Sequence, residues 1–220
     1  MFCLPTLKEA QMISLIQFPT VQNFASWEAF EIVGSMCLIL LTGLAAAFLG
    51  FFCAREFKGD KRKTILIFTL IAVFLAVMLL AFFGFTAAAI KGIILSLVLA
   101  FVSYSDLKTR ECPDFPYLMI AVAAFIGCDL HCLPDMLLAA FSVFCFQYFG
   151  AWATKAKLNG ADVKLATACA FLLGSARGIA GLIIGMLIGI IVNLIKLKDT
   201  KEGFPLLPYL AVGFMTAYFL

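Results

Sequence analysis

The stretch TILIFTLIAVFLAVMLLAFFGF at residues 64–85 decides the fold class, because it contains no charged side chain. About 20 consecutive apolar residues are enough for a helix to cross a bilayer. Similar stretches recur along the 220-residue chain, of which 64% is hydrophobic and 13% is charged. A soluble domain carries about 25% charged residues. The sequence therefore predicts an all-α fold, a polytopic bundle of membrane-spanning helices.

The apolar stretches predict about eight transmembrane helices. They lie near residues 32–54, 64–85, 90–106, 116–130, 135–153, 159–174, 177–196 and 205–220. A tight turn at Gly174–Gly178 is expected to separate the sixth helix from the seventh, because one overlong helix is the poorer alternative. Three parts follow: an N-terminal extracytoplasmic or interfacial segment at 1–31, two transmembrane helices with a short basic loop at 32–85, and a core of about six transmembrane helices at 86–220.

The basic residues indicate how the bundle is oriented. Of the 16 Lys and Arg, 12 fall in four alternate loops and 3 fall on the opposite side. Cytoplasmic loops of membrane proteins carry this excess, so we predict that these four loops face the cytoplasm. The net charge is only +3 and the basic residues form no stripe, which argues against a nucleic-acid partner.

Gly181, Gly185 and Gly189 recur at four-residue spacing in the predicted helix 177–196. Small residues at this spacing let helix backbones approach closely. We expect them to pack within the bundle. A dimer seam is the alternative, and the oligomeric state stays open.

Few side chains are available for chemistry. His131 is the one histidine, and it falls on a predicted outer loop. The absence of a His-Glu-x-x-His segment excludes an intramembrane zinc protease, and a nucleophilic Ser or Cys would lack a histidine base. Cys128 and Cys132 flank His131 and allow unpaired cysteines, a disulfide or a metal site; we expect unpaired cysteines and no metal.

Two of the 13 carboxylates stand apart from the others, which fall in loops or on the outer side. Asp106 ends the predicted span 90–106, and Asp162 lies in the first turn of the span 159–174, both at the cytoplasmic edge. Paired carboxylates can hydrolyse a peptide bond, because one takes a proton from water while the other gives one to the carbonyl and the leaving amine. The alternative is structural: Asp106 pairs with Arg110, and Asp162 caps its helix.

The helix dipoles suggest a role for each aspartate. A negative charge is favoured in the first turn of a helix, where Asp162 lies, and disfavoured in the last turn, where Asp106 lies, by about 0.3–1 kcal/mol each. We therefore predict that Asp162 is the base and Asp106 the acid. Arg110 would oppose this assignment if the helix continued that far, and the two carboxyls titrate jointly.

The residues around both aspartates resemble the type IV prepilin peptidase family. SDLKTRECPD at 105–114 is similar to the first family motif, an Asp at a span end followed by a basic loop and Pro-Asn or Pro-Asp. NGADVKL at 159–165 resembles the second motif, Gly-x-Gly-Asp-x-Lys, and FPLLPYL at 204–210 is similar to the Pro-x-x-Pro-Phe stretch that opens the last span of the family. The resemblance covers about 90–220, and the first two spans only in topology.

Three features depart from the family pattern. Asn159 and Ala161 replace glycines of the second motif, and Cys112 replaces an aliphatic residue. The loop between the first two spans is too short for the zinc-binding insert of many bacterial members, so the chain is similar to a short form. Gly160 and Asn159 are able to supply an unusual backbone turn, so we expect activity to persist.

The resemblance implies an aspartyl endopeptidase that removes the short basic leader from a prepilin-like protein whose next segment is a hydrophobic helix. Cleavage would occur at the cytoplasmic face of a prokaryotic plasma membrane. The implied catalytic residues are Asp106 and Asp162, and the residues implied to support the site or the substrate are Arg110, Glu111, Asp114, Gly160 and Lys164. Cleavage would need no metal or organic cofactor. S-adenosylmethionine would be needed only for methylation of the new terminus, which we do not expect.

Glu111 and Asp114 would present negative charge to the basic leader, and we hypothesise that they bind it; solvated loop charges are the alternative. Exposed charge pairs contribute about 0.2–1 kcal/mol, so Glu111→Gln and Asp114→Asn are each expected to raise the KM of the substrate by up to about fivefold. Steady-state kinetics check this, and an unchanged KM in both variants contradicts it.

Two other classes of protein remain. A presenilin-like or signal-peptide-peptidase-like protease shares a Gly-x-Gly-Asp motif but has Tyr-Asp deeper in its span, whereas Tyr104 here is one position off. A non-enzymatic transporter or assembly protein would place ionisable residues at mid-span, where these spans hold almost none.

Overall fold

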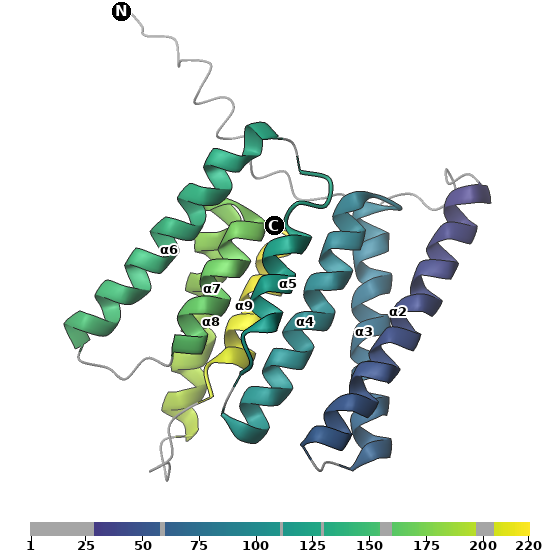
Figure 1. Ribbon diagram of the computed structural model, residues 1–220, viewed down its shortest axis with the longest axis horizontal. Helices are drawn as coiled ribbons and strands as arrows, with labels where there is room; N and C mark the ends of the chain where they lie inside the picture. Colours follow the sequence, from purple (N-terminus) through teal and green to yellow (C-terminus); the bar gives the residue numbers. More distant parts are fainter. Residues whose placement is uncertain (1–28, 58–59, 111, 129, 155–159, 197–204) are drawn as a thin grey trace, which may run out of the picture.

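The computed structural model describes residues 29–57, 60–110, 112–128, 130–154, 160–196 and 205–220 (Figure 1). All regular structure in these ranges is helical. The helices are α2 (Ala29–Glu56), α3 (Lys61–Phe83), α4 (Ala87–Thr109), α5 (Phe115–Ala123), the 3₁₀ helix η2 (Leu130–Cys132), α6 (Leu133–Thr154), α7 (Gly160–Leu173), α8 (Ser175–Lys196) and α9 (Leu207–Tyr218). The predicted all-α fold is confirmed, and each predicted span contains one α-helix. Most of the predicted N-terminal segment lies outside the described residues.

The helices fall into two length classes. Among the described residues, α2, α3, α4, α6 and α8 are long and apolar enough to cross a bilayer. The other three, α5, α7 and α9, have 9, 14 and 12 residues. Five long apolar helices make the chain a multi-pass membrane protein.

The predicted span 116–130 is longer than the helix found there. Helix α5 ends at Ala123, and the chain continues in tighter turns in which the backbone N–H of Ile126 donates to the carbonyl of Ala123. Gly127, at a φ of 60°, lies at the end of these turns. A φ in the left-handed region suits glycine and does not continue a right-handed helix, so the helical path stops short of residue 130.

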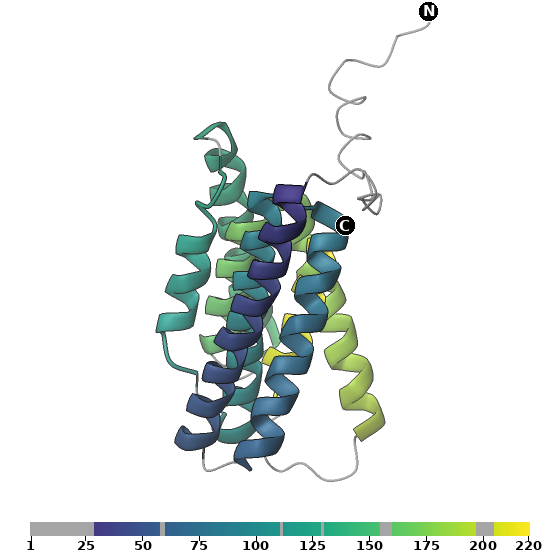
Figure 2. The same ribbon diagram turned by 90° about the vertical axis from the view of Figure 1, so that its right-hand side faces the viewer.

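Consecutive helices alternate in direction (Figures 1 and 2). The last turns of α2, α4, α6 and α8 therefore lie at the same end of the bundle as the first turns of α3, α5, α7 and α9, at the bottom of both views. This lower end is where the four basic loops were expected to gather. The described helix ends that border these loops lie on one side, and the compartment that they face stays a prediction.

Helices α8 and α9 pack so closely that their backbones are in contact. A Cβ added to Gly213 of α9 would lie 2.3 Å from the backbone N of Gly185 and 2.5 Å from the carbonyl O of Gly181, both on α8. A Cβ on Gly185 would lie 2.8 Å from the Cα of Leu210. The expected packing of Gly181 and Gly185 inside the bundle is therefore confirmed over a dimer seam.

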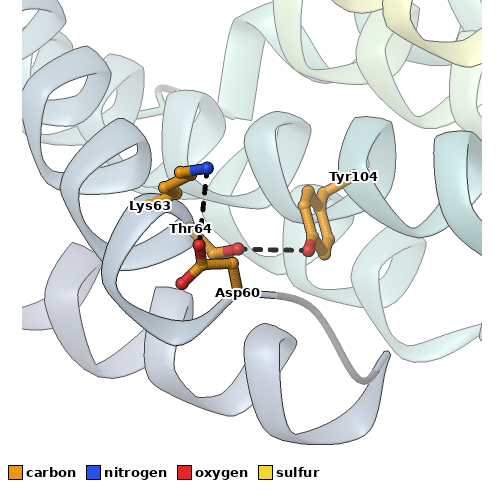
Figure 3. Close-up of polar contacts among 4 residues, drawn as sticks. All are labelled: Asp60, Lys63, Thr64 and Tyr104. Carbon is orange, nitrogen blue, oxygen red and sulfur yellow. Dashed lines mark hydrogen bonds and ion pairs between the residues drawn. The ribbon is translucent and has the colours of Figure 1, made fainter.

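Tyr104 fastens α4 to α3 near the lower end. Its hydroxyl lies 3.3 Å from Oγ1 of Thr64 (Figure 3), and its ring meets that of Phe68 edge-on at a centroid distance of 5.5 Å. Asp60, just before α3, pairs with Lys63 at 3.6 Å on the exposed surface. The two contacts of Tyr104 hold the last turns of α4 against α3.

At the opposite end, α6 caps α8. The backbone N–H of Ser175 donates to the carboxylate of Asp135 at 3.1 Å, and the Ser175 hydroxyl donates to the second oxygen. Gly174 makes the turn between α7 and α8 at a φ of 81°. The predicted tight turn between these helices is confirmed. It consists of Gly174 alone, because α7 ends at Leu173 and α8 begins at Ser175.

Within the described ranges, no disulfide joins Cys128 to Cys132. The thiol of Cys128 donates to Sδ of Met136 at 3.3 Å. Within the described ranges, no group of three or more His, Cys, Asp and Glu residues gathers as metal ligands would. Of the three alternatives for this pair, the disulfide is therefore not found.

Candidate active site

Asp106 lies in the last turn of α4 and is buried, with 4% of its surface exposed. The backbone N–H of Leu207, the first residue of α9, hydrogen-bonds its carboxyl group. The Oδ2 atom has no hydrogen-bond partner among the described residues. An acidic oxygen that is buried and unpartnered is uncommon in folded proteins and is a feature of functional sites.

Asp162 lies in the first turn of α7 and is buried as well, with 7% of its surface exposed. Helices α4 and α7 both contact α5 and α9, which lie between them. The electrostatic field of Asp162 reaches the hydroxyl of Tyr117 on α5. The structure thus brings the two aspartates to the same lower end of the bundle, on helices that share two neighbours.

Arg110 ends α4 with an unusual backbone. Its φ of 57° and ψ of 17° place it in the left-handed region, and its N–H donates to the carbonyl of Asp106 at 3.2 Å. Among the described residues other than glycine, Arg110 alone has a positive φ. The guanidinium charge acts on the Asp106 carboxyl, which is the influence that was expected to oppose an acid role for Asp106.

An ion pair joins the two sequence motifs. The Lys164 ammonium lies 2.6 Å from Oδ1 of Asp114, which precedes α5. Both side chains are exposed, at 56% for Lys164 and 78% for Asp114. An exposed pair contributes about 0–1 kcal/mol, so its significance is that it holds the beginning of α5 beside the beginning of α7.

The backbone turn expected from Gly160 is not found. Gly160 is the first residue of α7, it has no positive φ, and a Cβ there would meet nothing within 4 Å. Its helical conformation is open to any residue, so the prediction of an unusual turn was wrong for Gly160. Asn159 and Glu111 lie outside the described residues.

Two residues near the aspartates, Cys112 and Tyr117, were not predicted as site residues. Cys112 is half-buried in the segment between α4 and α5, and burial raises the pKa of its thiol, with the charges of Asp106 and Asp114 acting in the same direction. Tyr117 is 8% exposed, and its hydroxyl lies beside the Cys112 thiol, with which it shares a hydrogen bond. The one signal in the sequence was a phenol inside an apolar span, three residues after Asp114.

Comparison with known families identifies the segment that carries both aspartates. Residues 93–194, from α4 to α8, match the model of the type IV leader peptidase family. No curated protein and no solved structure matches the chain. The matched segment contains both motifs, Asp106 and Asp162 included, together with α5 and the ion pair that links them. Through these residues, the segment 93–194 is similar to the type IV leader peptidase family.

Proposed function

We propose that the protein is an aspartyl endopeptidase that removes the basic leader from prepilin-like proteins at the cytoplasmic face of a prokaryotic plasma membrane. The observation that carries this proposal is the burial of Asp106 and Asp162 at one end of the bundle, inside the segment that matches the peptidase family. Burying a carboxylate in a membrane protein costs stability, and such residues therefore mark functional sites. We assign no methyltransferase activity.

The proposed mechanism gives each aspartate one role. Asp162 is ionised and takes a proton from water as the water oxygen adds to the carbonyl carbon. Asp106 is protonated, donates a hydrogen bond to the carbonyl oxygen, and gives its proton to the amine as the C–N bond breaks. The position of Asp162 in the first turn of α7 and the unpartnered Oδ2 of Asp106 both support this assignment.

An apolar groove along α4 supports a substrate with a hydrophobic helix. It has a volume of about 570 Å³ and lies between α3, α4 and α9. Its lining includes Ile71, Leu99, Ser103, Leu107, Pro208 and Val212. On α4, Leu99, Ser103 and Asp106 follow one another at four- and three-residue spacing, so they share a helix face. A helix lying in the groove would therefore arrive with one end at Asp106.

Filling this groove is expected to weaken substrate binding without touching the aspartates. Val212 is 52% exposed at the edge of the groove, so Val212→Trp adds bulk where the substrate helix would lie. We expect the apparent KM in proteoliposomes to rise roughly tenfold, equivalent to about 1.4 kcal/mol, with kcat within about twofold. The matched control is Val33→Trp on α2, which is 59% exposed and away from the groove. Equal KM values in the two variants would remove the groove from substrate binding.

The experiment that tests the function is leader removal from several prepilin-like substrates by the protein reconstituted in vesicles, with the cut bond identified by mass spectrometry. We expect one cut, between the basic leader and the hydrophobic helix. A cut within the hydrophobic helix would favour a presenilin-like protease instead. No cut in any substrate would leave the non-enzymatic alternative.

A further inference from the structure

A second groove, on α3, runs from a cation at the beginning of the helix along an apolar surface. It has a volume of about 750 Å³, with Arg62 lining one end and Phe74 the other. The side chains that line it between these ends are apolar apart from Thr69. Leu66, Leu70 and Phe74 are 64%, 66% and 62% exposed, so no described helix covers them. The groove therefore faces the lipid around the bundle.

The length of this groove matches one leaflet of a bilayer. Arg62 and Phe74 are twelve residues apart on α3, which corresponds to about 18 Å at 1.5 Å per residue. Half of a hydrocarbon core of about 30 Å is about 15 Å. Arg62 lies in the first turn of α3, at the lower end of the bundle, and the rest of the groove extends from there toward the middle. One acyl chain of a lipid in that leaflet would therefore fill the groove and place its phosphate at the depth of Arg62.

The charge at this end of the groove is positive. The described residues at the lower end of the α2–α3 hairpin include four exposed basic and two exposed acidic side chains: Arg55, Lys61, Arg62, Lys63, Glu56 and Asp60. Lys63 pairs with Asp60 at 3.6 Å (Figure 3), whereas Arg62 makes no ion pair with a described residue. The first turn of a helix disfavours cations, so α3 gains no stability from the three that begin it. The positive-inside tendency accounts for basic residues in this loop, but not for one of them closing an apolar groove.

We propose that this groove binds an anionic phospholipid, with the phosphate at the Arg62 guanidinium and one acyl chain along Leu66, Leu70 and Phe74. A guanidinium matches the geometry of phosphate oxygens, and it can donate two parallel hydrogen bonds to them. Basic sites beside transmembrane helices hold anionic headgroups in this way. A zwitterionic lipid offers the same chain and phosphate, but the basic residues around Arg62 repel the cation of its headgroup. The inference goes beyond the proposed function and is independent of it, because neither aspartate takes part.

Native mass spectrometry of the purified protein in detergent, titrated with dioleoyl phosphatidylglycerol or dioleoyl phosphatidylcholine, tests the headgroup. The two lipids have the same chains, so the ratio of their Kd values reports the charge. One basic residue near a membrane surface contributes about 1 kcal/mol, a factor of about five, so we expect phosphatidylglycerol to bind at least about fivefold more tightly. Arg62→Gln should remove that preference. Lys61→Gln is the matched control: it removes the same charge one residue away, outside the groove lining, and should change either Kd by less than about twofold.

Leu70→Trp tests the acyl chain, because it fills the groove and leaves every charge in place. We expect it to weaken binding of both lipids by about fivefold or more. Leu44→Trp on α2, at a position that is 74% exposed and outside the groove, should change neither. Glycerol 3-phosphate has the phosphate without the chains, and we expect it not to displace the lipid.

Three results would overturn the inference. Equal losses in Arg62→Gln and Lys61→Gln would mean that the whole loop attracts anions diffusely, with no site at Arg62. Unchanged binding in Leu70→Trp, or displacement of the lipid by glycerol 3-phosphate, would remove the groove from binding. Equal affinity of the wild type for the two lipids would remove the role of charge. All substituted side chains are exposed, so Tm should stay within about 2 °C of the wild-type value and the comparison is made on folded protein.

Discussion

Asp106→Asn and Asp162→Asn are each expected to reduce leader removal by roughly 10²–10⁴-fold, the range in which positioned acids and bases contribute to catalysis. Asparagine has nearly the shape of aspartate but can neither take the proton from water nor give one to the amine. Both side chains are buried and carry negative charge when ionised, so the substitutions should leave the bundle folded. Single-turnover cleavage in vesicles, followed by gel shift, measures the effect.

Asp60→Asn is the matched control for these two variants. Asp60 lies at the same end of the bundle, but it is exposed and paired with Lys63 rather than buried between helices (Figure 3). We expect it to cleave at the wild-type rate. Undiminished cleavage by either Asp106→Asn or Asp162→Asn would remove that residue from the chemistry and contradict the two-aspartate mechanism.

Gly213→Ala is expected to destabilise the protein more than a Gly→Ala substitution at any of the other glycines whose surroundings the structure describes. The new Cβ would meet backbone atoms of Gly185 and Gly181 at 2.3–2.5 Å, and backbone cannot swing aside as a side chain can. Helices α8 and α9 must separate to admit it, with a loss of about 3 kcal/mol or more. For a chain of this length that corresponds to a fall of roughly 6–12 °C in Tm, measurable by thermal unfolding in detergent.

Gly150→Ala on α6 is the control, because a Cβ there would meet nothing within 4 Å. We expect its Tm to stay within about 2 °C of the wild-type value. Activity should fall with stability in Gly213→Ala, since α9 also carries Leu207, whose backbone holds the Asp106 carboxyl. A wild-type melting temperature for Gly213→Ala would mean that the α8–α9 contact is looser than the structure has it.

The helices were predictable because backbone polar groups in lipid must be hydrogen-bonded within the segment itself. An apolar run such as 64–85 can therefore cross the bilayer only as a helix. The burial of Asp106 and Asp162 at one end could be anticipated for a related reason, since each acid closes or opens an apolar run. The family match at 93–194 likewise falls on the motifs that carry the resemblance.

Features set by packing between helices were not predictable. Nothing local stops α5 at Ala123, and the left-handed conformation of Gly127 and Arg110 depends on what their neighbours contact. The same holds for the Lys164–Asp114 pair, whose members are 50 residues apart. The burial of Tyr117 was not predictable either, because only the assembled bundle covers its ring.

The three short helices affect how water reaches a hydrolytic site within the hydrocarbon core of the bilayer. At 1.5 Å per residue, α5, α7 and α9 reach only about 14, 21 and 18 Å, whereas the hydrocarbon core of a bilayer is about 30 Å thick. In Figure 1 they begin above the lower ends of α4 and α8. Lipid beside helices that are too short must thin, and the polar interface is drawn inward with its water. Hydration of the aspartates is then a property of helix length, and turnover becomes sensitive to the thickness of the surrounding membrane.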